Sequence, residues 1–471
     1  MGTTAGVSGR SRPLRAFGSL AGNRALLRVL VAYLMFTLTE YAVWIAMLVF
    51  AYRRGGTAIA GLVAVAQLGP AAVVAPVVAA VADRRSPVVL LAGGYVAQAA
   101  AMAGTAAAVY AGAPLAAYAG AVVAATAVTT TRPAQSALIP SVAATPDQLT
   151  AANVVVGWME AAGIAAAGLL AGVLVSLAGV GSVFAVCAAL GVLAALLVAG
   201  LRVMPPALEQ APGPGAEEPA TGIGDGLRLA VRRPRLRLML ALLTADAVVI
   251  GALDLLVVIL ALTVLGRQPG WAGYLQFAFG TGALLAATVS AVLVGRRLGG
   301  PILAAALVFS VALAAVASGL GLAGTVALLA VAGAGHSLLV VATRTLLQRS
   351  VPPHLTGRIF GILEGLTMAG LALGALLVPA LAHLGGSRLA VLGVAAVLPL
   401  AAVAGGRVVL RLDAGTAVPV VQIALLRSLP LFAEPGRLLR LTSQDLQWLV
   451  DTQPAVKARL AATLAERLQN R

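Results

Sequence analysis

The sequence has few charged residues and almost no cysteine. Asp, Glu, Lys and Arg make up 10% of the 471 residues, whereas 61% are hydrophobic and the mean hydropathy is +1.00. A soluble globular protein of this length does not need so much apolar surface, so the composition is that of a polytopic membrane protein. With Cys187 as its single cysteine, the chain has no internal disulfide and no cysteine-rich metal site. We expect Cys187 to be a small buried apolar residue.

The sequence also lacks the motifs of common enzyme chemistries. It has three histidines, no P-loop and no His/Cys/Asp cluster with the spacing of metal ligands. We therefore expect no enzymatic activity, no cofactor, no metal site and no direct use of ATP. The net charge of +16 could suggest nucleic acid. However, the arginines lie between apolar runs rather than on one soluble face, so we expect no nucleic-acid partner.

Twelve apolar runs are long enough to cross a bilayer as helices, at about 1.5 Å per residue against a hydrocarbon core of about 30 Å. They cover residues 29–52, 57–81, 88–110, 113–131, 150–175 and 180–201, then 236–265, 270–294, 301–319, 322–343, 359–384 and 387–410. Between the sixth and seventh runs, proline, glycine and acidic residues indicate a solvated linker.

The predicted fold is an all-α polytopic membrane protein with twelve transmembrane helices in two pseudo-symmetric six-helix bundles. Its parts are an N-terminal tail at 1–28, a bundle at 29–201, a linker at 202–235, a second bundle at 236–411 and a short helical tail at 412–471. Most arginines between the runs lie in the even-numbered loops, which predicts that these loops and both termini are cytoplasmic in the cell membrane. We expect the first run to be retained, because it is longer than the core of a signal peptide.

The two halves of the chain resemble each other. TTTRPAQSALIP, Thr129 to Pro140, ends the fourth run, and ATRTLLQRSVP, Ala342 to Pro352, ends the tenth. Each stretch is followed by an apolar run with an early carboxylate, Glu160 in the first half and Glu364 in the second. Two related bundles joined by a linker form the plan of a transporter that binds its substrate between the bundles near the midplane.

One loop carries a family resemblance. After the second run, AAVADRRSPVVLL resembles the signature between helices two and three of the major facilitator superfamily. Asp83, Arg84 and Arg85 match the acidic and basic core of that signature, while Ala79 and Ser86 stand in place of its usual glycines. The resemblance implies a monomeric transporter with alternating access, in which this cytoplasmic loop clamps helices and sets the conformational equilibrium.

Two further stretches extend this resemblance, which covers roughly residues 25 to 411. GIAAAG, Gly163 to Gly168, is similar to the Gly-Pro-x-x-x-Gly stretch of proton-coupled exporters, with Ile164 in place of the proline. PAQSALIP followed by DQLTAAN, Asp147 to Asn153, resembles the loop between spans four and five in bacterial drug- and siderophore-exporter branches. The resemblance therefore implies an exporter.

The C-terminal tail resembles a different domain. Val418 to Glu434 is similar to the entry helix of a cyclic nucleotide-binding domain, and Asp445 to Gln469 is similar to the helices that follow its β-roll. Only ten residues, PGRLLRLTSQ, lie between them. A phosphate cradle needs backbone N–H groups in a turn together with an arginine, and ten residues are too few to build it inside a barrel. We therefore expect no cyclic nucleotide binding, and a short tail that is either vestigial or a contact surface.

Carboxylates inside apolar runs are the main candidates for function. Five of the 16 acidic residues lie there, namely Glu40, Glu160, Asp246, Asp254 and Glu364. An ionised side chain at the centre of a membrane helix costs about 2.5–3.5 kcal/mol on insertion scales, and burial favours its neutral, protonated form. A carboxylate that takes up a proton on one side of the membrane and releases it on the other can couple proton flow to transport.

Glu40 and Asp254 are the leading pair among these candidates. Glu40 lies midway along the first run, and the loops YRRGG and LGRQPG align the two halves at an offset of about 212 residues. This offset places Asp254 within a turn of the position that corresponds to Glu40. Asp246, eight residues earlier, can also face inward. The alternative is that each carboxylate forms a structural hydrogen bond to a neighbouring helix.

A second group of candidates lies closer to the ends of the runs. His336 is a candidate proton relay, although the flanking AGAGHS equally predicts a close helix contact. Arg132 and Arg344 are expected at span ends, where such side chains commonly anchor a helix at the interface. They can also pair with Glu160 and Glu364 as parts of a cytoplasmic gate.

One face of the first run carries side chains that a lipid-facing helix does not need. At spacings of three and four residues this face carries Tyr33, Thr37, Glu40, Trp44 and Met47, and Tyr41 lies beside it. We expect these residues to line a central cavity for a small, moderately apolar solute, a cationic one included. Two hypotheses follow: a proton-coupled exporter, or a transporter-like scaffold or sensor that has lost transport.

Overall fold

The computed structural model describes residues 22–82, 86–142, 146–201, 232–289, 298–351 and 353–405. Within these ranges the chain is helical and contains no strand. The helices are α2 (Arg24–Ala82), α3 (Pro87–Tyr110), α4 (Pro114–Val142), α5 (Pro146–Ala178), α6 (Val180–Val198), α8 (Pro234–Ile259), η1 (Leu260–Val264, a π-helical turn), α9 (Trp271–Val289), α10 (Gly299–Val316), α11 (Gly321–Ser350) and α12 (Pro353–Ala404). The C-terminal tail, most of the linker and the loop at 83–85 lie outside the described residues.

Local sequence explains where many of these helices begin. Five of them start at a proline, namely Pro87, Pro114, Pro146, Pro234 and Pro353. Proline suits the first helical position, because its fixed φ is helical and its missing N–H has no partner there in any case. Helix α2 begins instead behind Asn23, whose side-chain oxygen accepts a hydrogen bond from the Leu26 N–H at 3.1 Å, as an N-cap residue does.

Helices α2 and α12 each contain two membrane passes. The backbone leaves the helical conformation at Gly55–Gly56, with φ of −150° and 63°, and at Gly385–Gly386, with φ of −157° and 73°. Both pairs lie where a short loop was expected between two apolar runs. Counting α2 and α12 twice, the described helices make the twelve passes that the sequence predicts.

The turn at Gly56 requires glycine, because its φ of 63° is in the left-handed region. We expect Gly56→Ala to lower the free energy of unfolding by about 1–2 kcal/mol. Thermal unfolding of the purified protein in detergent measures the loss. The control is Gly104→Ala on α3, where a helical glycine has open space beside it. That variant is expected to gain stability, since alanine is the better helix former, and an equal loss in both variants would contradict the prediction.

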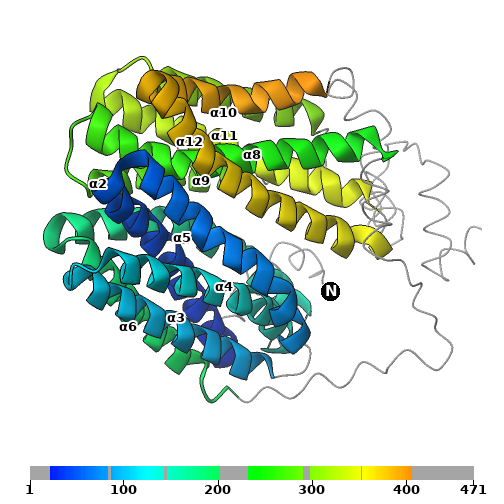
Figure 1. Ribbon diagram of the computed structural model, residues 1–471. Coiled ribbons are helices and arrows are strands. Elements are labelled where there is room, and N and C mark those ends of the chain that lie inside the picture. Colours follow the sequence, from blue (N-terminus) through cyan, green and yellow to red (C-terminus); the bar gives the residue numbers. More distant parts are fainter. Residues whose placement is uncertain are drawn as a thin grey trace, which may run out of the picture.

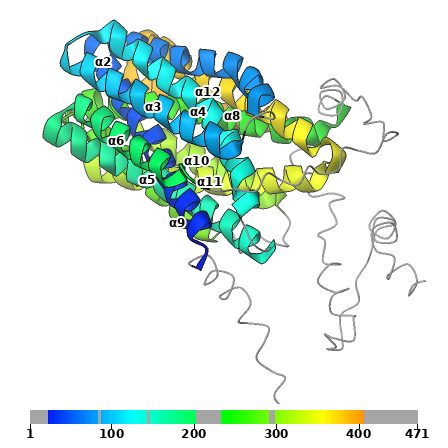
Figure 2. The same cartoon turned by 90° about the horizontal axis from the view of Figure 1, so that it is seen from below.

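The passes form two groups, α2–α6 and α8–α12, which Figure 1 shows as a blue-to-teal and a green-to-orange set. Viewed at 90° to this, the helices of both groups run along one common direction (Figure 2). We call the end of the helices that carries Arg24, Val198 and Pro234 the linker end. The opposite end, with Gly55–Gly56 and Gly385–Gly386, is the hairpin end.

The two groups pack together through glycines near the hairpin end. Gly168 and Gly172 of α5 lie directly against the backbone of Gly273 and Gly270 at the start of α9, with no room for a side chain between them. Small residues allow such close approach between membrane helices. In Figure 1 the groups meet at this end and diverge toward the linker end.

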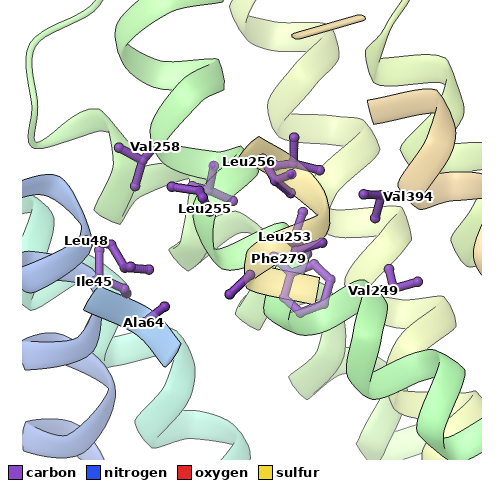
Figure 3. Packing of buried hydrophobic residues seen from close by; sticks show 14 of the residues in the cluster. Ile45, Leu48, Ala64, Val249, Leu253, Leu255, Leu256, Val258, Phe279 and Val394 are labelled. Atoms are coloured by element: carbon purple, nitrogen blue, oxygen red, sulfur yellow. The ribbon is translucent and has the colours of Figure 1, made fainter. Parts of the chain in front are cut away.

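Helix α8 forms the centre of the apolar core. Eighteen of its 26 residues are buried, as is typical of a helix that is hydrophobic on every face. Figure 3 shows Leu253 and Leu255 of α8 in the same cluster as Ile45 and Leu48 of α2, so apolar packing continues from one half of the protein to the other.

The outer surface of the helices is apolar, as a bilayer requires. Leu115, Leu177, Leu384 and Val403 are each at least 76% exposed. Eight helices in the described part of the chain are long and apolar enough to cross a membrane by length and composition, and α4 adds the shorter apolar segment Pro114–Val128. The protein is therefore a multi-pass membrane protein.

Candidate functional site

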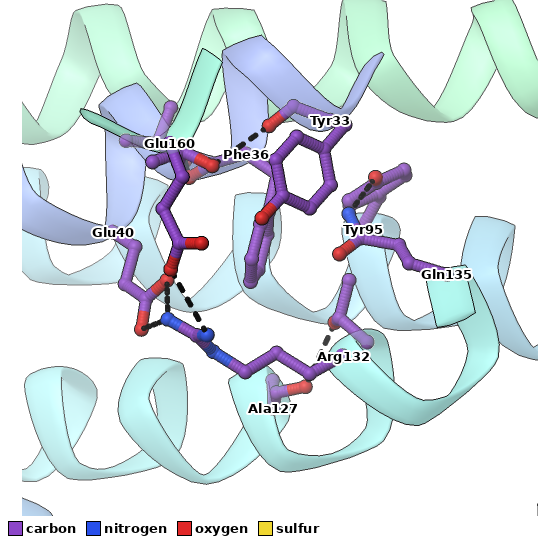
Figure 4. A network of polar contacts seen from close by, with 11 residues as sticks. Tyr33, Phe36, Glu40, Tyr95, Ala127, Arg132, Gln135 and Glu160 are labelled. Atoms are coloured by element: carbon purple, nitrogen blue, oxygen red, sulfur yellow. Dashed lines mark hydrogen bonds and ion pairs between the residues drawn. The ribbon is translucent and has the colours of Figure 1, made fainter. Parts of the chain in front are cut away.

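Three charged side chains meet between helices α2, α4 and α5. One terminal nitrogen of Arg132 donates hydrogen bonds to both carboxylate oxygens of Glu40, at 3.0 and 2.9 Å. The other terminal nitrogen lies 3.8 Å from Oε1 of Glu160. The three side chains point toward one another (Figure 4). We call Glu40, Arg132 and Glu160 the charged trio; with both carboxylates ionised it has one excess negative charge.

The position of Arg132 differs from the expected one. The fourth run was predicted to end at residue 131, which would place Arg132 at an interface, but α4 continues to Val142. The apolar run ends before the helix does, because backbone hydrogen bonds extend a helix through polar residues. Arg132 therefore lies inside α4 and pairs with two carboxylates instead of anchoring a helix end. In the same way α11 continues to Ser350, past Arg344.

Aromatic and amide groups lie beside the trio. The Arg132 guanidinium is 6.0 Å from the centre of the Phe36 ring, which in turn lies 6.0 Å from the ring of Tyr95. Gln135 Nε2 donates a hydrogen bond of 2.6 Å to the Tyr95 hydroxyl. Sequence reasoning missed Tyr95 and Gln135. For Tyr95 the available signal was a polar side chain inside an apolar run, the same signal that identified the carboxylates, whereas Gln135 lies beyond the expected end of the fourth run.

A second polar contact joins the two halves of the protein. Trp44 Nε1 on α2 donates to Asp254 Oδ2 on α8 at 2.9 Å, and Gln276 Nε2 on α9 lies 3.5 Å from the other oxygen of Asp254. Closer to the hairpin end, the hydroxyls of Tyr52 and Thr263 are 2.6 Å apart. Both contacts join residues that are separated by about 210 positions in the sequence.

Glu40 and Asp254 are therefore not each other's partner. Glu40 is bound to Arg132 in its own half, and Asp254 is bound by Trp44, one helical turn along α2 from Glu40. The expected correspondence between the halves placed both carboxylates near the centre of the protein. It did not determine which side chains on neighbouring helices reach them.

A third polar contact lies within the second half. His336 Nδ1 on α11 is 2.9 Å from Asp246 Oδ1 on α8. The imidazole packs with two aromatic rings in a triangle, with its centroid 5.6 Å from that of Phe279 and 5.8 Å from that of Phe309, and with those two rings 6.1 Å apart. The close helix contact expected around AGAGHS is present, because Gly333 lies directly against the Phe279 carbonyl.

The expected cavity-lining face of α2 is only partly open. Thr37 is 2% exposed and packs against Gly163 of α5, and Met47 is 0% exposed within the apolar core. In this conformation neither side chain faces an open space. Tyr33, Tyr41 and Trp44 are half-buried. The expectation that five residues of one helix face line a cavity together is thus corrected for two of them, because α2 is surrounded by other helices.

The remaining candidates are less informative. Arg344 and Glu364 are both exposed, and within the described chain no ion pair joins them. Asp83, Arg84 and Arg85 lie outside the described residues. The described residues also contain no group of three His, Cys, Asp or Glu side chains that could hold a metal ion.

Comparison with known proteins agrees with this architecture. The solved structures that resemble the chain include a bacterial homologue of the human lysosomal transporter Spinster, inward-facing and unoccupied, with a TM-score of 0.63 and 17% identity over 84% of this chain and 99% of that one. A mutant of the nucleoside transporter NupG has a TM-score of 0.65 and 16% identity over 82% of this chain and 100% of that one. At 16–17% identity, these similarities concern the fold alone.

The family comparison covers most of the chain. A search among curated proteins finds no significant match. The model of the Major Facilitator Superfamily, in contrast, matches residues 29–362, which is more than half of the chain and extends from the first pass into α12. Together with the twelve passes in two halves, this match shows that the chain belongs to the major facilitator superfamily.

Proposed function

We propose that the protein is a proton-coupled secondary-active exporter of a small, moderately apolar solute, which binds between the two halves. Membrane transport itself follows from the family and the fold, which are those of transporters rather than enzymes. The observation that carries the proton-coupled part is the arrangement on α2. Glu40, bound to Arg132, lies one turn from Trp44, which holds Asp254 of the other half.

Protonation changes both of these contacts. An ionised Glu40 forms charge-assisted hydrogen bonds with Arg132, and a protonated Glu40 loses the attraction between the charges. The guanidinium then has Glu160 as its remaining charged partner, 3.8 Å away. In the same way, a proton on Asp254 turns its charge-assisted bond from Trp44 into a weaker neutral one, which loosens the contact between the halves.

The solute class is inferred from the surroundings of the trio. The side chains of Arg132, Glu40 and Glu160 are 45%, 22% and 41% exposed, although exposure of charges to lipid is costly. We infer that the exposed parts face a water-accessible space between the halves. The excess negative charge, beside the rings of Tyr33 and Phe36, favours a solute with an apolar body and a positive charge.

The proposal includes an orientation. If the arginine-rich linker end is cytoplasmic, the glycine contacts at the hairpin end close the outer side, and the structure corresponds to an inward-facing state. The similar Spinster homologue is also described as inward-facing. We place the protein in the cytoplasmic membrane because of the same arginine distribution. We expect a monomer, because the two halves already form the proposed substrate site within one chain.

Flux into proteoliposomes tests the proposal. With ethidium as the probe, an imposed pH gradient is expected to drive accumulation by the wild type. Glu40→Gln and Asp254→Asn are expected to lose gradient-driven accumulation while they retain downhill exchange, because each variant removes one proton-exchanging carboxyl. Glu364→Gln serves as the control, since this carboxylate is exposed and lies away from the trio.

Three results distinguish the alternatives. Gradient-driven flux that persists in both carboxyl variants would contradict proton coupling at these positions. Accumulation driven by the opposite pH gradient would show that the direction of transport is the reverse of the proposed one. The absence of flux for a broad panel of apolar cations and neutral solutes would favour a scaffold or sensor.

A further inference from the structure

We propose that Asp246 and His336 form a second proton-binding site, which accepts its proton on Nε2 of the imidazole. The two side chains come from α8 and α11, within the second half of the protein, and the charged trio lies in the first half. For its role in transport this inference rests on the proposed function. Proton binding by the pair does not depend on it.

The contact selects one form of the histidine when Asp246 is ionised. An ionised carboxylate can only accept a hydrogen bond, so the 2.9 Å contact then places a hydrogen on His336 Nδ1. In the neutral ring the lone pair is then on Nε2. Asp246 thus acts as the residue that orients the imidazole and selects its tautomer.

The surroundings make the position of the ring well defined. The rings of Phe279 on α9 and Phe309 on α10 both contact the imidazole, and Gly333 and Gly335 hold α11 against the backbones of these two helices. The Asp246 side chain is 6% exposed, whereas that of His336 is 24% exposed. The carboxylate is therefore enclosed, and the histidine is the more accessible member of the pair.

Charge balance favours occupancy by one proton. The pair has a net charge of −1 when the ring is neutral and zero when Nε2 accepts a proton from water to form an imidazolium–carboxylate pair. An isolated charge is more costly than a hydrogen-bonded ion pair in apolar surroundings. A single proton transfer therefore converts the less favourable state into the more favourable one, and no other bond is formed or broken.

The helices packed against the ring carry few charges. Helices α9 and α10 have no charged residue within 271–289 and 299–316. On α8 and α11 the nearest other charged residues are Asp254 and Arg344, eight positions from Asp246 and His336 respectively. The neighbouring positions on α9 and α10 are the two phenylalanines. Across α8, helix α12 contributes the small residues Gly370 and Gly374, which lie against the backbone of α8. The carboxylate at position 246 is thus the dominant charge at this site.

The pair is connected to the contact between the halves through α8. Eight residues separate Asp246 from Asp254, about 12 Å along a helix. Asp254 accepts the hydrogen bond from Trp44 of the first half. A proton on His336 of α11 changes the charge beside α8 at Asp246, and the contact with the other half lies about two turns further along α8.

Imidazole ¹⁵N spectra of the purified protein test the site directly. The chain has three histidines, so His336→Gln identifies the signal of the ring. We expect the neutral wild-type ring to carry its hydrogen on Nδ1 and to gain a second one on Nε2 between pH 9 and pH 5. In Asp246→Asn the preference for Nδ1–H is expected to disappear. Asp254→Asn, which alters another aspartate on α8, is the matched control and should retain the Nδ1–H tautomer.

The inference is overturned by a neutral wild-type ring with its hydrogen on Nε2, or by a ring that does not change its protonation in this range. It is also overturned if Asp246→Asn has the same spectra as the wild type. Should Asp246→Asn fail to fold, Asp246→Glu retains a carboxylate and is expected to retain the tautomer. These spectra require neither substrate nor flux, so their failure and a failure of coupling at Glu40 or Asp254 are distinguishable.

Discussion

Gly273→Leu is expected to abolish transport. Gly273 at the start of α9 lies directly against the backbone of Gly168 and Gly172 on α5, which is a principal contact between the two halves at the hairpin end. A side chain at position 273 has no space there, and overpacking of this kind costs about 1–3 kcal/mol. Because closure of the hairpin end requires this contact, the variant holds the halves apart and cannot complete the alternation.

A pair of cysteines at positions 52 and 263 reports whether the two halves separate at the hairpin end. The hydroxyls of Tyr52 and Thr263 are 2.6 Å apart across the junction, and the native Cys187 is buried and can be replaced by alanine to give a clean background. Because a cysteine is much shorter than the tyrosine it replaces, we expect a bifunctional thiol reagent, rather than a direct disulfide, to join Tyr52→Cys to Thr263→Cys in the otherwise wild-type protein. Most of this cross-linking should be lost when Gly273→Leu is added. Gly104→Leu, a helical glycine with open space beside it, is the matched control. Equal flux in the two leucine variants would contradict the role of the glycine contact.

The arrangement of passes was predictable because the bilayer imposes it. A run such as Val29 to Tyr52 has to be helical in lipid, and the polar segment after residue 201 marks the division between the halves. The carboxylates inside the runs were predictable for the same reason, since a charge in an apolar run is costly and conspicuous. Glu40, Asp246 and Asp254 all take part in polar contacts between helices.

The partners of these groups were not predictable in the same way. Trp44 reaches Asp254 and His336 reaches Asp246 because of how each helix is rotated about its axis, and packing against neighbours sets this rotation. The pair of Arg132 with Glu160 was among the expectations, whereas the continuation of α4 past Arg132 was not predictable, because hydropathy shows where an apolar run ends and not where the helix ends. Met47 has the spacing of the polar face of α2, and yet it is buried in the core by the helices around it.

Arg132→Gln is expected to cause the largest loss of stability among the polar variants. The guanidinium is the charged partner of Glu40 at 2.9 Å and of Glu160 at 3.8 Å. Removal of one partner from a fully buried pair costs about 3–5 kcal/mol, and the partial exposure of these side chains reduces our expectation to about 2 kcal/mol. Gradient-driven transport should fall at least tenfold, since the two carboxylates lose the cation that holds them together.

A double variant separates the charge effect from the loss of side-chain packing. Arg132→Gln with Glu40→Gln removes one charge of each sign and is expected to recover at least half of the lost stability, measured by thermal unfolding in detergent. Arg344→Gln is the matched control, because Arg344 occupies the corresponding sequence repeat but is exposed, and the structure describes no ion pair for it. It should lose less than about 0.5 kcal/mol. If the double variant is less stable than Arg132→Gln alone, the trio is held by packing, and Glu40 is not the residue whose charge Arg132 neutralises.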